Sequence, residues 1–370
     1  MATHQAYVKP SPDDLLERQS LETRQPSTGQ VLIDVLAAPV GAAANVLLSG
    51  KIYPLAYPLT PGGSAVARVA AVGPDAVKLK KGQLVYCSTY VQARDDHTGA
   101  TSILQGGFAM PTPDSIKLME GPWRHGTWAQ KALVPTENIT VLDESRLFGH
   151  FGYTAAQLCW ITSFLITSEG WDVIGLTAGE TVIVAPASGH LGSLTIRTAL
   201  ALGAGTVIAA ARNSEKLQKV AKFADDPRVR TVTLTGDAAA DTQALRAATP
   251  RGEGADVYMD FSPPQAVDVN YPSACVDALK RGGRVILEGG VNGKLTLNYL
   301  TLIVNNITIK GNLMFKTDAP SKLIRLIESG QLDLNKLETK TVKFEDDPEE
   351  ALKAAEKSTD IGVATTLVFQ

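Results

Sequence analysis

The segment TVIVAPASGHLGSLTIRTALALGAGTVIAAARN, residues 181–213, decides the fold class of this chain. It consists of an apolar run, a glycine-containing turn, a stretch with helical spacing and a second apolar run that ends in arginine. A strand, a helix and a second strand in this order are typical of a βαβ unit, whose two strands are parallel and buried on both faces. The segment therefore predicts an α/β domain with a parallel sheet.

The same alternation extends over residues 156–305. The stretch NSEKLQKVAKF is expected to form a helix with Ser214 as its N-cap. The apolar runs in VRTVTLTGD, GADVYMDFS and GGRVILEGGVNG are expected to be further strands. Repeated alternation of strands and helices predicts a doubly wound parallel sheet for this part of the chain.

Residues 1–155 follow a different pattern. Short apolar runs with β-branched residues, bounded by Gly and Pro, follow one another without helices between them, which predicts a compact antiparallel barrel. Within this part, residues 94–128 are rich in Gly, Pro, Thr and Asp and are expected to form a long functional or mobile loop. Residues 306–370 return to mixed structure, with amphipathic helices and a closing strand expected.

The 370 residues carry a net charge of −3, with 20% charged and 44% hydrophobic residues. This balance argues against a nucleic-acid or anionic-membrane partner, because both select basic surfaces. The first residues lack the pattern of a secretory signal, and no apolar run reaches the ~18 residues that a membrane span needs. The cysteines Cys87, Cys159 and Cys275 are few and scattered, which suits a reducing compartment without disulfides. A cytoplasmic protein is therefore expected.

The turn after the first apolar run is similar to the dinucleotide-binding pattern G-x-G-x-x-G, with alanine in the first place. Its candidate cofactor-binding residues are Ala187, Ser188, Gly189, His190, Leu191 and Gly192. At Gly189 the missing Cβ would let a pyrophosphate approach the backbone, and Gly192 would let the helix pack closely on its strand. The N-terminus of that helix would offer free N–H groups to the phosphates. The alternative is that the glycines only form a tight turn.

Arg212 stands at the end of the second strand, where NAD-binding units carry an acidic residue that binds the adenosine ribose hydroxyls. An acid would repel a 2′-phosphate, whereas an arginine can pair with it through two hydrogen bonds. Asn213 and Lys216 follow closely and could add donors. The sequence therefore favours NADPH as the cofactor. The alternatives are that Arg212 is a solvated charge, or that it stacks on the adenine of either cofactor.

Two further pairs of candidate cofactor-binding residues follow later strands. Gly290 and Val291 follow the apolar run of GGRVILEGGVNG and are expected near the nicotinamide. Phe261 and Ser262 end the segment GADVYMDFS and are expected to flank the adenosine. The alternative for these residues is a structural role in the core and in a turn.

Taken together, these segments resemble the medium-chain dehydrogenase/reductase superfamily over essentially the whole chain. The resemblance rests on the order and spacing of GQVLIDVLAAPV, PGGSAVARVAAVG, LKKGQLVYC, GTWAQKALVP, TAGETVIVAPASGHLGS, GADVYMDFS, GGRVILEGG and EEALKAAEKSTDIGVATTLVF. It implies a GroES-like β-barrel domain formed by residues 1–155 and 306–370, and a Rossmann domain formed by residues 156–305. It also implies an active site in the cleft between the domains, and a homodimer.

The zinc-dependent alcohol dehydrogenases of this superfamily bind catalytic zinc through an early cysteine, a Gly-His-Glu sequence and a later cysteine. The corresponding places in this chain hold Gly41, then Gly63 with Ser64, and finally Cys159. One thiolate cannot hold a tetrahedral zinc ion, and the four-cysteine lobe that binds structural zinc is also missing. The comparison therefore implies a protein without a metal ion.

The chain thus resembles the zinc-independent quinone oxidoreductase and enoyl reductase branch. SGKIYPLAYPLTPGG is similar to the segment in which that branch carries a tyrosine near the nicotinamide, so Tyr53 is the candidate catalytic residue; its alternative is packing in or on the barrel. The implied reaction is hydride transfer from NADPH to an α,β-unsaturated carbonyl or a quinone. Without zinc, the enolate formed there is easier to stabilise than an alkoxide. The expected partner is therefore a small, apolar and conjugated substrate.

Other functions stay open on the same fold. One is a zinc-free ketone reductase or alcohol dehydrogenase, and another is a cofactor-binding protein with lost or non-redox activity. The lining of the substrate pocket is expected to include bulky apolar residues, although core packing is the alternative for each of them. The candidates are Phe151, Tyr153, Trp160 and Phe164.

Overall fold

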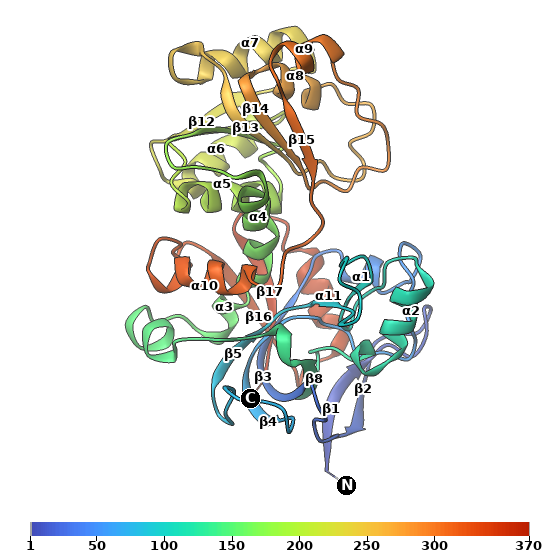
Figure 1. Cartoon of the computed structure of the whole chain (residues 1–370). Helices are drawn as coiled ribbons and strands as arrows, with labels where there is room; N and C mark the ends of the chain where they lie inside the picture. Colours follow the sequence, from blue (N-terminus) through green and yellow to red (C-terminus); the bar gives the residue numbers. More distant parts are fainter. Residues whose placement is uncertain (1, 370) are drawn as a thin grey trace.

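The predicted parallel sheet is present in the computed structural model, which describes residues 2–369. Six strands lie in the order β12, β11, β10, β13, β14 and β15, and each neighbouring pair is parallel. These strands span Thr181–Ala185 (β10), Thr206–Ala211 (β11), Val229–Thr233 (β12), Ala255–Asp260 (β13), Leu279–Leu287 (β14) and Thr308–Gly311 (β15). They form the upper domain in Figure 1.

Helices cover both faces of this sheet, because successive strand residues point to opposite sides. Val182 and Val184 of β10 pack with α4, α5 and α6 on one face, whereas Ile183 packs with α7 and α8 on the other. The helices span Ile161–Ile174 (α4), His190–Ala201 (α5), Ser214–Ala224 (α6), Ala238–Ala248 (α7), Tyr271–Asp277 (α8) and Tyr299–Val304 (α9). Apolar residues on both faces explain why the strands read as continuous apolar runs.

Helix α6 begins one residue earlier than its sequence suggests. Ser214 was expected to be the N-cap, but the cap is Asn213, whose side chain accepts a hydrogen bond of 2.9 Å from the backbone N–H of Lys216. Asn213 has extended backbone angles, so its short amide can fold back onto the first turn. Ser214 is the first helical residue.

Both ends of the chain build the lower domain, where blue and red segments lie side by side in Figure 1. Its main sheet has the order β16, β17, β3, β4, β5 and β9, and β8 pairs with β3. The strands span Gln30–Val40 (β3), Ala65–Val72 (β4), Leu84–Cys87 (β5), Lys131–Pro135 (β8), Ile139–Val141 (β9), Glu338–Lys343 (β16) and Val363–Val368 (β17). The fold class predicted from the sequence is confirmed: a β-barrel domain is combined with a doubly wound parallel sheet.

Shorter elements complete the lower domain. Two small sheets pair Thr3–Val8 (β1) with Glu17–Glu22 (β2), and Tyr90–Gln92 (β6) with Ser102–Leu104 (β7). The helices are Ala44–Leu47 (α1), Pro113–Glu120 (α2), Ala155–Leu158 (α3), Ala319–Glu328 (α10) and Pro348–Glu356 (α11). Single turns of 3₁₀ helix span Pro122–Arg124 and Thr136–Asn138, and a π-helical segment spans Ser145–His150. A further 3₁₀ turn, Pro250–Gly252, lies between α7 and β13 of the upper domain.

Two expectations about boundaries need correction. The parallel sheet does not end at residue 305, because the edge strand β15 continues it to Gly311. The stretch 94–128 is not one long loop: β7 and α2 lie within it, and Ile103, Met119 and Trp123 form a small apolar core with Val91. That local core, rather than the polar composition, determines the structure of this stretch.

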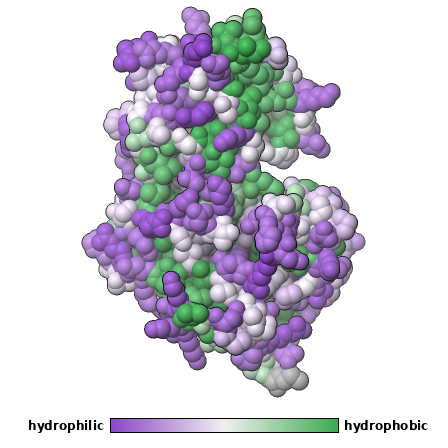
Figure 2. Space-filling view, viewed as in Figure 1, coloured by the Kyte–Doolittle hydropathy of each residue, from purple (hydrophilic) through white to green (hydrophobic). Residues whose placement is uncertain are grey.

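An apolar surface covers α9 and the edge strand β15, and Figure 2 shows hydrophobic residues gathered on the upper domain where these elements lie. Its exposed large side chains are Tyr299, Leu300, Ile303, Val304, Ile309 and Leu313. Cys87, Cys159 and Cys275 are buried free thiols. Within residues 2–369, no helix combines the length and the apolar character that a membrane span requires.

Candidate active site

A cleft of about 620 Å³ opens at the carboxyl ends of β10, β11, β13 and β14. This is the edge at which open parallel sheets bind ligands. Most of the predicted cofactor-binding residues line it together. They are Ser188, Gly189, His190, Leu191, Gly192, Arg212, Asn213, Lys216, Phe261, Ser262 and Gly290.

Ala187 and Val291 do not line this cleft. Ala187 is fully buried beneath the turn, in the core between β10 and the helices, and its N–H donates to the carbonyl of Ala210. The side chain of Val291 lies beside Gly293 in the loop after β14. The first place of the glycine pattern thus belongs to the core, and the loop turns away one residue after Gly290.

The two glycines of the turn face different surroundings. A Cβ added at Gly189 would have no atom within 4 Å, so this backbone faces open space at the N-terminus of α5. A Cβ added at Gly192 would lie only 2.2 Å from the carbonyl oxygen of Pro186. The turn therefore leaves room for a ligand at Gly189 and presses the helix onto the strand at Gly192. Both features suit a pyrophosphate held by the first N–H groups of α5.

Arg212 and Lys216 are exposed on the wall of the cleft, at the end of β11 and in the first turn of α6. Asn213 uses its side-chain oxygen as the cap of α6, which leaves its amide N–H₂ as a donor. The groups on this wall are thus positive or neutral, and they fit an anionic substituent.

A buried polar cluster surrounds Ser262, and its other members, Tyr258, Asp260 and Tyr271, were not among the sequence predictions. The Asp260 carboxylate at the end of β13 accepts hydrogen bonds from the hydroxyls of Tyr258 at 2.8 Å and Ser262 at 2.5 Å. The Ser262 hydroxyl also lies 2.5 Å from that of Tyr271. Burial raises the pKa of Asp260 above its usual value, although the donated hydrogen bonds oppose that shift. The signal in the sequence was an acid at the end of an apolar strand, in the run ADVYMD.

Glu288 was also missed, although it lines the same cleft just before Gly289 and Gly290. Its Oε1 accepts a hydrogen bond of 2.5 Å from the side-chain amide of Asn312, and its Oε2 is buried without a partner among the described residues. Burial raises the pKa of Glu288 to about 8, and the negative charge of Glu169 adds to that effect. A neutral carboxyl is therefore expected here at neutral pH.

A second cavity of about 710 Å³ adjoins the cleft, and His190 and Leu191 line both spaces. Small residues occupy one side of the cavity, from Gly41 to Ala44. Hydroxyl and amide side chains such as Thr89 and Gln105 contribute to the rest of the lining, together with larger apolar side chains, namely Leu47, Leu48, Leu55, Phe108, Trp128, Trp160, Ile166 and Met314. The small residues of VGAAAN thus widen an apolar cavity beside the cleft.

Trp160 is the one aromatic residue among the four predicted pocket residues that lines this cavity. Phe164 is fully buried in the core, and the hydroxyl of buried Tyr153 lies 2.9 Å from the Oδ1 of Asp333. Phe151 packs under the guanidinium of Arg146. These three aromatic residues do not line the cavity and instead belong to an apolar cluster that also includes Trp160.

Tyr53 does not line the cavity either. Its ring stacks on Phe108, with 4.1 Å between the ring centroids, and Phe108 is the residue that faces the cavity. The structure thus places Tyr53 behind the wall. A catalytic role for Tyr53 is still only a prediction, and it would require a different arrangement of this segment.

The residues that stand where the zinc enzymes carry their catalytic zinc ligands all line the cavity, but their side chains do not form a suitable set of metal donors. Gly41, Gly63, Ser64 and Cys159 all line it. Ser64 is hydrogen-bonded to Thr162, and burial raises the pKa of the Cys159 thiol to about 12. In residues 2–369, no group of three or more His, Cys, Asp or Glu side chains is arranged to hold a metal ion. The side chains present therefore do not fit a tetrahedral zinc site.

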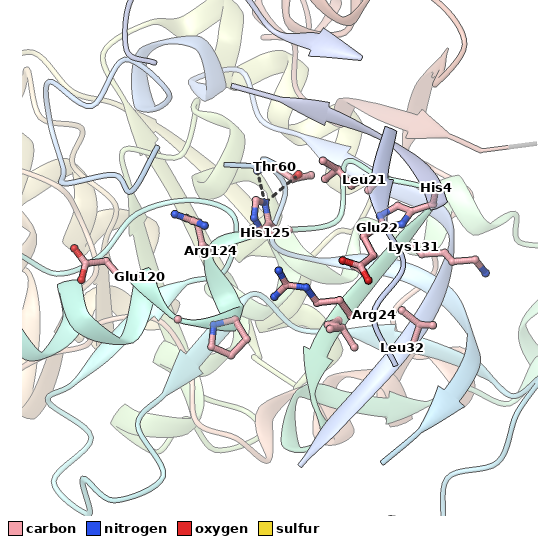
Figure 3. Close-up of a pocket in the computed structure, with 16 residues that line it drawn as sticks. His4, Leu21, Glu22, Arg24, Leu32, Thr60, Glu120, Arg124, His125 and Lys131 are labelled. Atoms are coloured by element: carbon pink, nitrogen blue, oxygen red, sulfur yellow. Dashed lines mark hydrogen bonds between the residues drawn. The ribbon is translucent and has the colours of Figure 1, made fainter. Parts of the chain in front are cut away.

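A third cavity, of about 380 Å³, lies apart from both spaces and shares no lining residue with them. Figure 3 shows it between the hairpin of β1 and β2 and the segment that follows α2. The His125 ring accepts a hydrogen bond of 3.2 Å from the backbone N–H of Thr60. Burial, followed by the charges of Arg124, Arg24 and His4, lowers the pKa of His125 to about 4. A neutral His125 stabilises the wall here, and the cavity is not part of the candidate active site.

Two family models match most of this chain. Residues 27–144 match the alcohol dehydrogenase GroES-like domain, and residues 191–329 match the family described as zinc-binding dehydrogenase. A probable zinc-binding alcohol dehydrogenase of Mycobacterium tuberculosis is 26% identical over 87% of this chain and 77% of its own length. The L-threonine 3-dehydrogenase of Pyrococcus horikoshii is 24% identical, over 94% of each chain.

A solved structure of similar fold is a putative zinc-binding dehydrogenase from Sinorhizobium meliloti bound to NADP. It covers 100% of each chain with a TM-score of 0.77 and 16% sequence identity. The identity is low, so this likeness concerns the fold.

Proposed function

Because the chain belongs to the medium-chain dehydrogenase/reductase superfamily, we propose that it is an oxidoreductase that reduces conjugated carbonyl compounds or quinones with NADPH and without zinc. The observation that supports this most is the meeting of two spaces at His190 and Leu191. One space suits a dinucleotide, and the other is apolar and lacks a set of metal ligands. A reaction between a cofactor and a small apolar substrate requires this adjacency.

NADP(H) is the cofactor that the cleft suits. The open space at Gly189 and the N-terminus of α5 match the pyrophosphate. The exposed Arg212 and Lys216 match the 2′-phosphate. The Sinorhizobium meliloti protein of the same fold is bound to NADP. When bound, the reduced nicotinamide supplies the hydride, and the residues of the chain bind, orient and exclude water.

We also propose that this chain binds no catalytic zinc ion, in contrast to the zinc-binding enzymes named among its relatives. It rests on Gly41, Gly63 and Ser64 in the places of three donors. Without a Lewis acid, the site must stabilise the oxygen that becomes negative by hydrogen bonds alone. A conjugated substrate spreads this charge into an enolate, which lowers the demand on those hydrogen bonds.

A zinc-free ketone reductase or alcohol dehydrogenase is the second candidate, because several of the similar proteins are named as alcohol dehydrogenases. A panel of 2-cyclohexenone, a naphthoquinone, cyclohexanone and cyclohexanol distinguishes the two functions. Our proposal predicts NADPH oxidation with the first two compounds at the higher kcat/KM. Turnover of cyclohexanone or cyclohexanol alone would support the second candidate instead.

The cofactor preference is tested by calorimetric titration of the full chain with NADPH and with NADH. We expect NADPH to bind at least about tenfold more tightly, and the substitution Arg212→Ala to remove that difference of ~1.4 kcal/mol. Arg325→Ala, an exposed arginine on α10 away from the cleft, is the matched control and should retain the preference. If neither cofactor binds to the wild type, the oxidoreductase proposal is wrong.

A further inference from the structure

His190 is the first residue of α5 and lies where the cofactor cleft meets the substrate cavity. Its ring stacks on Trp160, with 5.5 Å between the ring centroids and 22° between the planes. Its Nε2 lies 3.3 Å from the Oγ of Ser163, which also lines the substrate cavity. Two contacts from α4 thus fix the imidazole at the junction of the two spaces.

Other polar side chains of the cavity are less suited to carry a proton. Ser64 Oγ lies 2.7 Å from Thr162 Oγ1, which lies 3.0 Å from the hydroxyl of buried Tyr86, so these hydroxyls partner one another. Among the lining residues that the structure describes, Cys159 and His190 are the titratable ones. Burial keeps Cys159 a thiol by raising its pKa to about 12. In this lining, His190 alone has a usual pKa close to neutral pH.

We propose that His190 and Ser163 form the proton-donating pair of the substrate cavity. The inference rests on the proposed reductase function and adds to it the residues that replace zinc at the substrate oxygen. The protonated imidazole donates through Nε2 to Ser163 Oγ, and the Ser163 hydroxyl donates to the oxygen on which negative charge develops. Donors fixed before the reaction in a cavity of low polarity are the arrangement that stabilises such an oxygen.

Reduction of a conjugated carbonyl consumes one hydride and one proton. The hydride from NADPH forms a C–H bond at the β-carbon, the π electrons move onto the carbonyl oxygen, and NADP⁺ is the oxidised product. The oxygen takes the proton of Ser163, Ser163 takes the proton of His190, and the imidazole is reprotonated from water. The enol tautomerises in water to the saturated carbonyl. For a saturated ketone, the hydride adds to the carbonyl carbon and the same proton completes the alcohol.

The direction of the pH dependence follows from the surroundings of His190. Burial lowers its pKa below the usual 6.5, because the charged ring loses water. Cys159 on the cavity side is neutral, while Arg212, Lys216 and Glu288 line the adjoining cleft. The donor form is therefore lost as the pH rises through a value below 6.5. The kcat/KM for reduction should fall over that range, and the kcat/KM for the reverse oxidation should rise.

The first test does not depend on turnover. Histidine Cε1–H signals of the full chain are followed by NMR from about pH 5 to pH 8, the range in which histidines titrate. His190 is assigned by the loss of one signal in His190→Gln. We expect its midpoint below 6.5 and a shifted midpoint in Ser163→Ala. A midpoint unaffected by Ser163→Ala would overturn the pairing.

The second test compares pH profiles of kcat/KM for the best substrate of the panel. Glutamine can still donate to Ser163 but cannot carry the proton, so His190→Gln should lower kcat/KM about 10²-fold or more. The break in the pH profile below pH 6.5 should also disappear in this variant. Ser163→Ala should lose a similar factor, and this variant, whose residue lies outside the cofactor cleft, should bind NADPH as the wild type does. His150→Gln, an exposed histidine on the barrel side, is the matched control.

The outcomes separate the two proposals. If the wild type binds no NADPH, the proposed function fails, whatever the NMR titration shows. If the wild type turns over and His190→Gln keeps the wild-type rate and profile, the proton-donating pair is refuted while the reductase function stands.

Discussion

Alanine substitutions at Gly189 and Gly192, three residues apart, should have different effects on stability and cofactor binding. Gly189 faces open space and has φ of −87° and ψ of 170°, angles that alanine adopts without strain. Gly189→Ala should therefore change the melting temperature little, since Gly to Ala at a helix N-cap costs only about 0.5–1 kcal/mol. The new methyl group would occupy the space expected for the pyrophosphate, so NADPH affinity should fall by at least about tenfold, or ~1.4 kcal/mol.

Gly192→Ala should instead destabilise the fold. Its Cβ would lie 2.2 Å from the carbonyl oxygen of Pro186 and 3.0 Å from the Cα of Ala187, and these backbone atoms cannot rotate away. Overpacking of this kind costs about 1–3 kcal/mol. For domains of this size each kcal/mol lowers the melting temperature by roughly 2–4 °C. Cofactor binding should weaken as well, because α5 must move away from its strand.

Differential scanning calorimetry and NADPH titration of the two variants measure both effects. If Gly189→Ala binds NADPH as tightly as the wild type does, the pyrophosphate does not approach this backbone. If Gly192→Ala is as stable as the wild type, the close packing of α5 on the turn is not rigid.

Two further predictions concern Glu288 and the exposed apolar surface. Burial raises the pKa of Glu288 from 4.5 to about 8, so its neutral carboxyl favours the folded state at low pH, and this contribution is lost as the pH rises from 4.5 through about 8. Glu288→Gln should therefore flatten the decline of the melting temperature over that range, and an identical decline in both proteins would show that the carboxyl is ionised throughout. The exposed edge strand β15 and helix α9 suit a homodimer, because unpaired strand edges and large apolar patches are where chains associate. Ile309→Lys should give monomers in sedimentation velocity, whereas Val77→Lys, at an exposed apolar site elsewhere, should not; a wild type that is already monomeric would contradict the dimer.

The sequence was informative where the structural signal is local. The strands β10 and β11 and the helix between them follow directly from apolar periodicity, and Arg212 lies at the cleft because β11 ends just before it. The different surroundings of the backbone at Gly189 and Gly192 could be predicted because the βαβ turn fixes both positions. These predictions depended on a single supersecondary unit.

The sequence was less informative where the position of a side chain depends on packing between distant segments. Tyr53 stacks on Phe108, from a part of the chain expected to be a loop, and of these two residues only Phe108 lines the cavity. Phe164 and Tyr153 have the same apolar character as Trp160, yet they face the core between the domains. Which side of a helix faces a cavity is decided only once both domains are in place.

The residues on which the zinc-free proposal rests also shape the chemistry of the cavity. Glycine and alanine at 41–44, with Gly63 and Ser64, take away three donors and leave volume in their place. A wide apolar cavity raises the free energy of a charged intermediate, because no ion and little water stabilise it. Hydride transfer there requires either a substrate that delocalises its charge or a fixed hydrogen-bond donor at the junction with the cofactor. His190 occupies that junction and contacts Ser163, so the proposed pair would supply a donor beside a cavity whose described lining residues form no set of metal ligands.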